Sequence, residues 1–348
     1  NKYRFDDFGT SAVTLDLQEG STYVFDQSDS SNAGHPIRFG TSANGTDYTT
    51  GVTHTGTPGS AGAKTTLVLG TGVSTLYYSC ANHSGMGGQI NTNSTAGASN
   101  FDGSIQAVAK ADNTYGFSCV KYTGNGSAAT IGHGLSSTPK WIVKKFASAT
   151  SSWDVYHESV GAGKRLVLNT TAAEASTSSY QNVNSSTFDV HAGNNDSGVT
   201  MIAYCWSEVP GFSKFDSYTG NGSFSGPTVT LGFKPRYILL KNSSSGGQDW
   251  KVFDSARDPS YQSGINQEVL YPNAANAADQ NYGLEFTDTG FNVKDDSSSL
   301  NENGSTIIYM AFADTPDGSV IDSLIDTPTN YDASSGNNGG NYATWSPL

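Results

Sequence analysis

The chain has 348 residues, which is enough for two or three domains, and only 14% of them are charged. Its polarity comes from Ser, Thr, Asn and 40 glycines, a composition typical of turn-rich β structure. The net charge of −13 excludes nucleic acid as an expected partner, because an acidic surface repels phosphates. The sequence contains no run of 18 apolar residues, so we expect no membrane insertion.

Residues 1–92 alternate short strand-like runs with clusters of Ser and Gly. In the run 74–80, a period of two places Leu76, Tyr78 and Cys80 on one face. No helical stripe appears. We therefore expect a β-sandwich domain over 1–92, followed by a flexible polar linker over 93–101.

Residues of types that bind soft metals lie at the end of the run 74–80 and just after it. Cys80, His83 and Met86 have Cys-x2-His-x2-Met spacing, so a tight loop after a strand can point all three at one centre. His35, in a strand-like run further upstream, is the candidate second imidazole. Two His, one Cys and a weak axial Met form the ligand set of blue copper, and zinc is the lesser option. The alternative is that these residues are ordinary core and turn residues.

This part of the chain resembles the cupredoxins, the plastocyanin and amicyanin group, on residues 34–39 and the loop from Cys80 to Met86. The resemblance implies a cupredoxin-like sandwich in which His35 and His83 are imidazole ligands, Cys80 the thiolate and Met86 the axial ligand. Pro36 departs from the pattern. Many cupredoxins carry there a polar residue that hydrogen-bonds the ligand sulfur, whereas proline has no N–H. The departure bears on the redox potential more than on the fold.

The rest of the chain contains one module twice. The sequence Tyr-Thr-Gly-Asn-Gly occurs at 122–126 and again at 218–222, and the closing strand at 202–208 recurs at 308–314. Each copy holds about six strand-like runs separated by turn signals, as in a β-sandwich. The expected fold is all-β: two tandem jelly-roll or β-sandwich repeats at 102–210 and 211–315 follow the first domain, and a tail or further segment occupies 316–348.

Trp153 and Trp250 stand at the same position of the two copies. Equal positions in duplicated modules usually share a packing role, so we expect both to be core anchors. The alternative is that they form a platform on which a glycan stacks.

No catalytic motif appears in the sequence, and we expect no enzyme. The first copy's histidines lack His counterparts in the second, which favours surface or loop positions for His133, His157 and His191. The acidic pairs at 6–7 and 295–296 suggest solvated charge, with a loosely bound Ca²⁺ as the alternative. We expect Cys119 and Cys205 to be free thiols, although a bridge between them is the alternative.

The two copies resemble modules in virion proteins of marine tailed phages, cyanophages especially. The resemblance rests on residues 122–139, 203–222, 254–259 and 321–330, and it covers nearly the whole chain. It implies a non-enzymatic virion protein: a tail fibre, a tail-associated or a capsid-decorating component. The expected partners are copies of itself, other virion proteins and a host-surface receptor or glycan, and the expected location is the virion or the extracellular space. The alternatives are a secreted copper protein that transfers electrons and a lectin-like adhesin.

Overall fold

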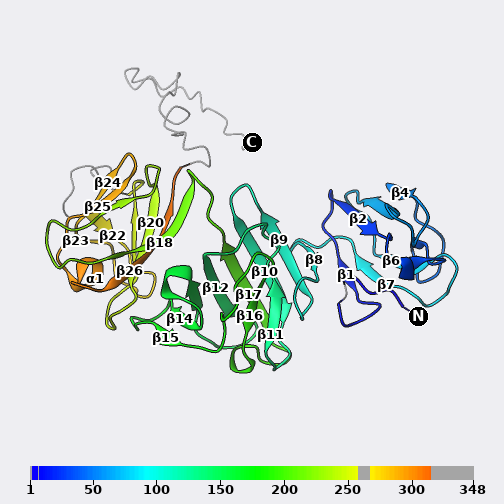
Figure 1. The fold of residues 1–348 in the computed structure, drawn as a ribbon, viewed down its shortest axis with the longest axis horizontal. Coiled ribbons are helices and arrows are strands. Elements are labelled where there is room, and N and C mark those ends of the chain that lie inside the picture. The colour runs from blue at the N-terminus through cyan, green and yellow to red at the C-terminus, as the bar shows by residue number, and fades with distance from the viewer. Residues whose placement is uncertain (1, 7, 258–266, 315–348) are drawn as a thin grey trace, which may run out of the picture.

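A computed structural model describes residues 2–6, 8–257 and 267–314. Its regular secondary structure is almost entirely strands, which confirms the all-β class, and its sheets form three units in a row (Figure 1). The N-terminal domain lies at one end, the first repeat in the middle and the second repeat at the other end. Among the described residues, no helix has the length and apolar character needed to cross a membrane. The tail expected at 316–348 lies outside the described residues.

The N-terminal domain is a sandwich of a four-stranded and a three-stranded sheet. The alternation in 74–80 is confirmed, because Leu76, Tyr78 and Cys80 are all buried in the core between the sheets. The first sheet has the order β1 (Leu15–Asp16), β7 (Gly88–Asn91), β6 (Leu76–Cys80), β3 (Ile37–Gly40); the second has β2 (Thr22–Asp26), β5 (Lys64–Val68), β4 (Val52–Thr55); a 3-10 turn, η1, covers Ser30–Asn32.

The segment expected to be a flexible linker is structured in its second half. Strand β8 (Ala98–Asn100) pairs with β9 (Ala107–Asp112) at the edge of the first repeat's sheet. Phe101 stacks on Phe5 of the N-terminal domain with 5.7 Å between ring centroids. Composition alone missed this, because a polar strand at a sheet edge looks like a linker when its partner is unknown.

The first repeat consists of a large sheet and a two-stranded sheet that enclose a core of alternating residues. Val120, Ile142, Ala203 and Phe188 point into this core from four different strands. The large sheet has the order β15 (Ala175–Ser176), β14 (Lys164–Val167), β13 (Asp154–His157), β12 (Trp141–Phe146), β17 (Thr200–Trp206), β10 (Phe117–Thr123), β9, β8; the small one pairs β11 (Ala129–Gly132) with β16 (Thr187–Val190); the 3-10 turns are η2 (Glu158–Val160) and η3 (Ala192–Asn194).

The second repeat has the same strand order, so the duplication read from the sequence is also a duplication of topology. The order β10-β17-β12-β13 of the first repeat corresponds to β18-β26-β20-β21 of the second, and β11-β16 corresponds to β19-β25. Its elements are β18 (Ser213–Thr219), β19 (Thr228–Thr230), β20 (Tyr237–Asn242), β21 (Lys251–Asp254), β22 (Gln267–Val269), β23 (Asp279–Tyr282), β24 (Leu284–Thr287), β25 (Gly290–Val293), α1 (Ser298–Asn301) and β26 (Thr306–Phe312).

The large sheets of the two repeats pack against each other through their outer faces. On β12, Ile142 points into the core of its own repeat, whereas Trp141 and Val143 point toward the other repeat. A separate apolar core therefore joins the repeats, and the central strands are buried on both faces. Its buried members are Trp141, Val143, Val155, Val160, Leu166, Phe215, Leu239, Trp250, Ile308 and Met310.

Of the three histidines expected at surface or loop positions, His157 is a buried strand residue, so that expectation is wrong for it. His133 lies in the loop after β11 but is buried. His133 is 0% exposed and His157 is 1% exposed, whereas His191 is exposed. His157 lies between the repeats: its Nδ1 accepts from the backbone N–H of Ser159, which leaves Nε2–H to donate to the carbonyl of Tyr309 in the second repeat. Burial lowers the pKa of His157 from 6.5 to about 4, so the ring is neutral at neutral pH.

The cysteines Cys80, Cys119 and Cys205 are free. On the paired strands β10 and β17, Cys205 stands opposite Ser118 and Cys119 stands opposite Tyr204. The one-residue offset sends the two sulfur atoms to opposite faces of the sheet. The expectation of free thiols is confirmed.

Candidate metal centre

Strand pairing brings His35 and Cys80 to the same end of the N-terminal domain. Ile37 at the start of β3 pairs with Cys80 at the end of β6, so His35 lies just beyond the end of that ladder. His83 follows Cys80 by three residues in the loop to β7. Three residues of metal-binding types, two histidines and one cysteine, therefore meet where two antiparallel strands end.

The three ligand atoms converge. Sγ of Cys80 lies 3.5 Å from Nδ1 of His83 and 3.8 Å from Nδ1 of His35. The imidazole rings are 4.6 Å apart between centroids, and all three ligand atoms lie within 4.8 Å of one another. Cys80 is buried, His35 is half-buried and His83 is exposed, so the cluster lies at the domain surface with its sulfur on the inner side.

These separations fit coordination of one metal ion. Bonds of about 2.3 Å to sulfur and about 2.0 Å to nitrogen, meeting at about 110–120°, place the two atoms about 3.5–3.7 Å apart. The observed S–N separations lie at or next to this range. A thiolate with two imidazoles is a soft donor set that suits copper or zinc rather than Mg²⁺ or Ca²⁺.

Hydrogen bonds from outside the cluster hold the two ligand loops. The carbonyl of His35 accepts from the Tyr3 hydroxyl at 2.7 Å and from Nε2 of Gln27 at 2.9 Å. The Asn82 side chain donates to the carbonyl of Gly34 at 2.9 Å, which ties the His83 loop to the His35 loop. Such bonds fix ligand orientation before a metal arrives.

The missing N–H at Pro36 is compensated from the other loop. The backbone N–H of Asn82 points at Sγ of Cys80 at 3.4 Å, so the sulfur still receives an amide donor. Pro36 itself accepts from the N–H of Ala81 at 2.9 Å, which extends the β3–β6 ladder by one bond. The sequence pattern alone suggested only the loss of a donor.

Met86 is the candidate fourth ligand. It is buried in the same core as Cys80, and its carbonyl accepts from the N–H of Tyr3 at 3.2 Å. Met86 and His35 also line one surface hollow. Gly87, the next residue, lies close against β6: a Cβ there would meet the carbonyl of Tyr78 at 1.7 Å.

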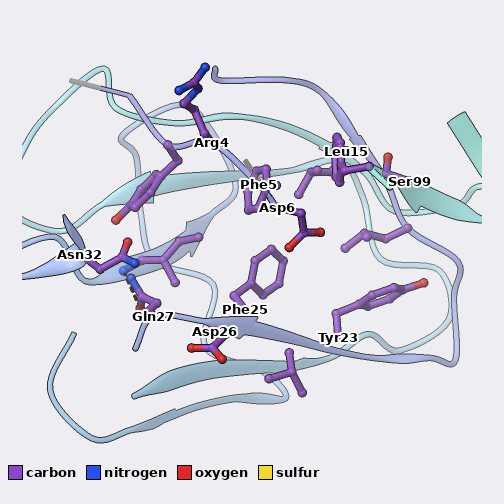
Figure 2. Close-up of a pocket in the computed structure, with 15 residues that line it drawn as sticks. Arg4, Phe5, Asp6, Leu15, Tyr23, Phe25, Asp26, Gln27, Asn32 and Ser99 are labelled. Atoms are coloured by element: carbon purple, nitrogen blue, oxygen red, sulfur yellow. Dashed lines mark hydrogen bonds between the residues drawn. The ribbon is translucent and has the colours of Figure 1, made fainter. Parts of the chain in front are cut away.

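A second hollow opens beside this site, between the N-terminal segment and β2 (Figure 2). It has a volume of about 260 Å³, and its wall combines aromatic rings with charged groups. Phe5, Phe25 and Tyr23 supply the apolar surface, and Asp6 and Asp26 carry carboxylates. No sequence motif marks this hollow, because its lining comes from separate short segments.

The other candidate residues lie away from the metal centre. Trp250 is 0% exposed, and its Nε1 donates to the carbonyl of Val167 across the inter-repeat core, so its ring is not available to a glycan. Trp153 is half-buried, with the ammonium of Lys145 6.0 Å from the centre of its ring.

The acidic pair at 295–296 differs from the expectation of solvated charge. The Asp295 carboxylate is buried and accepts from the backbone N–H groups of Gly283 and Ser297, so it is not a solvated charge. Asp7 lies outside the described residues.

Comparison with known proteins adds one family. No curated protein and no solved structure matches the chain. A family model described as a domain of unknown function, DUF7483, matches residues 89–316. The match spans both repeats and leaves out His35, Cys80, His83 and Met86. Since it covers about two thirds of the 348 residues, the chain belongs to the DUF7483 family.

Proposed function

We propose that the N-terminal domain binds one copper ion through Nδ1 of His35, Nδ1 of His83 and the thiolate of Cys80, with Met86 as a weak fourth ligand. The observation that supports this most is the convergence of three ligand atoms within 4.8 Å. Cysteine, histidine and methionine together are the donors of the blue-copper ligand set. Copper, when bound, supplies one-electron redox chemistry, and the chain's own residues hold and orient the ligands.

Titration of the full-length protein with Cu(II) tests this. We expect one equivalent to bind and to give an intense absorption near ~600 nm from the Cys80 thiolate. Cys80→Ser abolishes the band, whereas Cys119→Ser, which removes a half-buried thiol in the first repeat, leaves it unchanged. Binding of zinc without any coloured copper complex, or a band that survives Cys80→Ser, contradicts the proposal.

A second pair of variants tests the imidazoles. His83→Gln is expected to weaken copper binding by about 10-fold or more, because one nitrogen donor is lost from the metal. His54, on β4 of the same domain, is the matched control. Its Nδ1 lies 2.9 Å from Oγ1 of Thr65, so its hydrogen-bond partner is not one of the candidate metal ligands. His54→Gln should leave both the stoichiometry and the affinity unchanged.

We further propose that the whole chain is a non-enzymatic structural component of a phage virion, with the copper domain at one end of a stiff double repeat. Three features support this role: the resemblance of both repeats to virion modules, the acidic composition, and the apolar core that joins the repeats without a flexible hinge. Phage appendages are symmetric oligomers, so copies of this chain and other virion proteins are the expected partners.

Immunogold electron microscopy on particles from the source culture tests the virion role. Gold at one fixed position on tailed particles supports it and identifies the appendage. Gold absent from particles, together with a protein that stays monomeric in light scattering, contradicts it. That outcome leaves the copper site intact and favours a secreted copper protein.

A further inference from the structure

A lysine, an asparagine and an aspartate meet inside the first repeat. Lys144 on β12 is 1% exposed, and its ammonium donates to Oδ1 of Asn194 and, at 2.8 Å, to the Asn194 carbonyl. Asp154 on β13 is also buried, and its Oδ2 accepts from Nδ2 of the same asparagine. Lys144 and Asp154 are cross-strand partners, with 4.0 Å between Nζ and Oδ2.

The second repeat has the same fold without the cluster of Lys144, Asp154 and Asn194. Register places Leu240 opposite Lys251 on β20 and β21, where the first repeat has Lys144 opposite Asp154. Asn195 and Asn301 are also equivalent, because each donates Nδ2 to the loop of its Gly-Asn-Gly motif. The residues before them are Asn194 and Leu300. The second repeat thus places two buried leucines where the first has Lys144 and Asn194.

We propose that Lys144 and Asn194 form an intramolecular isopeptide bond, with Asp154 as the catalytic acid–base. The amine hydrogen-bonded to Oδ1 is next to the amide carbon that it must attack, and the carboxylate contacts the nitrogen that must leave. An amine, a carboxamide and a carboxyl group held together in a buried site are the reactants and the catalyst that amide exchange needs.

The reaction balances with the groups present. The Lys144 ammonium passes a proton to the Asp154 carboxylate, and the free amine attacks Cγ of Asn194, so that the Nζ–Cγ bond forms. Asp154 returns a proton to Nδ2, the Cγ–Nδ2 bond breaks, and ammonia leaves. It takes up the last proton of the attacking nitrogen and departs as ammonium. Lys144 and Asn194 are then joined by an amide, and Asp154 is again a carboxylate.

The surroundings favour the first and last steps. Burial lowers the pKa of Lys144 to about 8, so the neutral amine is accessible near neutral pH. Arg165 donates to Oδ1 of Asp154 at 2.6 Å, which leaves Oδ2 aimed at Asn194. A surface hollow lined by Phe146, Arg165 and Asn194 gives ammonium a route to solvent.

The bond would close a loop from β12 to η3 and lock the first repeat. The three cysteines are free, so among the described residues no disulfide closes this loop. A covalent link across 50 residues restricts the unfolded chain in the way a disulfide does. It would give a virion component a resistance to unfolding that does not depend on redox conditions.

The intact mass of the purified full-length chain tests the proposal. We expect a mass about 17 Da below that of the sequence, the loss of one ammonia. Tryptic digestion should give one linked species that joins 141–145 to 166–214, because modified Lys144 is no longer cleaved. Folded protein with the full sequence mass and no linked peptide, both when fresh and after ageing, overturns the proposal.

The second repeat supplies variants that suit the fold. Lys144→Leu and Asn194→Leu introduce the residues found at the equivalent positions, and both should restore the full mass. Asp154→Asn keeps the side-chain shape, and it should slow or abolish the mass loss. Lys145→Leu, one residue along the same strand, is the control. It should keep the mass deficit, and its linked species should join 141–164 to 166–214, because the cleavage site at Lys145 is lost.

Two readouts distinguish the isopeptide bond from a different loss of ammonia and from a link without structural effect. Succinimide formation at an Asn-Gly step also removes ammonia, but it would persist in Lys144→Leu, so a deficit that survives this change contradicts the assignment. The link should also raise the unfolding temperature, by about 10 °C relative to Asn194→Leu. An Asn194→Leu variant that is folded, has the full mass and shows an unchanged unfolding temperature would overturn the stabilising role.

Discussion

At the residue scale, the same side-chain type serves different purposes according to its contacts. His35 and His83 point Nδ1 at the Cys80 sulfur, whereas His133 and His157 use Nδ1 to accept a backbone N–H. The last two are buried and need the neutral ring, because a proton on Nδ1 would replace the acceptor with a second donor. The sequence could not separate these groups, since the difference lies in what each ring faces.

Stability is expected to fall as the pH is lowered from about 6.5 to about 4, in part because His157 must gain a proton. Its pKa is about 4 in the folded chain, against an ordinary 6.5, through burial between the repeats; Asp216 opposes this shift and Lys140 adds to it. The unfolded chain therefore binds more protons in this window, and stability rises with pH across it. The difference corresponds to about 3 kcal/mol at most.

Denaturant unfolding at several pH values measures the effect. His157→Gln keeps a donor and an acceptor but does not titrate, so the pH dependence should be reduced. His133, whose pKa burial also lowers, accounts for part of what remains. The control is His191→Gln, which changes an exposed ring and should behave as the unmodified chain. An equal pH dependence in His157→Gln and the unmodified chain would show that His157 does not contribute.

At the element scale, the recurring Tyr-Thr-Gly-Asn-Gly sequence forms the same loop contact in both repeats. Gly126 and Gly222 have φ of 75° and 65°, as expected for turn glycines. Their N–H groups donate to the carbonyls of Asn195 and Asn301 at 2.7 Å. The motif therefore joins the end of β10 or β18 to the loop before the closing strand. Sequence repetition identified the turn, and tertiary structure identified its partner.

Gly124→Ala is expected to destabilise the first repeat by about 1–3 kcal/mol through overpacking. A Cβ at Gly124 would lie 2.3 Å from the carbonyl of Asp196, which is backbone and cannot rotate away. Gly220→Ala should have a similar effect in the second repeat, where the carbonyl of Glu302 lies 2.2 Å from the added atom. Thermal unfolding measures both.

The matched control is Gly246→Ala, because the nearest atom to its added Cβ is 3.9 Å away. Its unfolding temperature should stay close to that of the unmodified chain. Equal stability of Gly124→Ala and Gly246→Ala would mean that the loop can shift to accept a methyl group. The close approach at Gly124 would then not be needed for stability.

At the scale of the whole molecule, the two repeats act as one body because their sheets share an apolar core. Trp141 and Trp250 meet in this core with 5.9 Å between ring centroids. Backbone bonds add to the joint, including Gly247 N–H to Thr171 and Glu174 N–H to Ser243. The family match likewise spans both repeats as one unit, at 89–316.

Trp250→Ala is expected to reduce the free energy of unfolding by about 3–5 kcal/mol, because it opens a cavity between the repeats. In calorimetry, the unmodified repeats should unfold in one transition, and the variant should show two. Trp153→Ala changes the equivalent position of the first repeat, which is half-buried, and should have less than half the effect. Two transitions in the unmodified protein would contradict a shared folding unit.

The sequence by itself determined the all-β class and the duplication, and it named all four residues of the candidate metal site, His35 among them. Alternation of apolar residues, turn glycines and the spacing of Cys80, His83 and Met86 are local patterns. They can be recognised in the sequence without knowledge of the fold. The repeat offsets also placed Trp153 and Trp250 at one position. The repetition did not predict that these two rings have different surroundings.

Only the tertiary structure decided which residues meet across long separations. It brought His35 within 3.8 Å of Cys80, buried His157 between the repeats, made a strand of the supposed linker, and assembled Lys144, Asp154 and Asn194 in one core. Such contacts depend on strand order and register, which pair segments far apart in the chain. A lysine in an apolar strand carries no local sign of its partner, because that partner comes from another element.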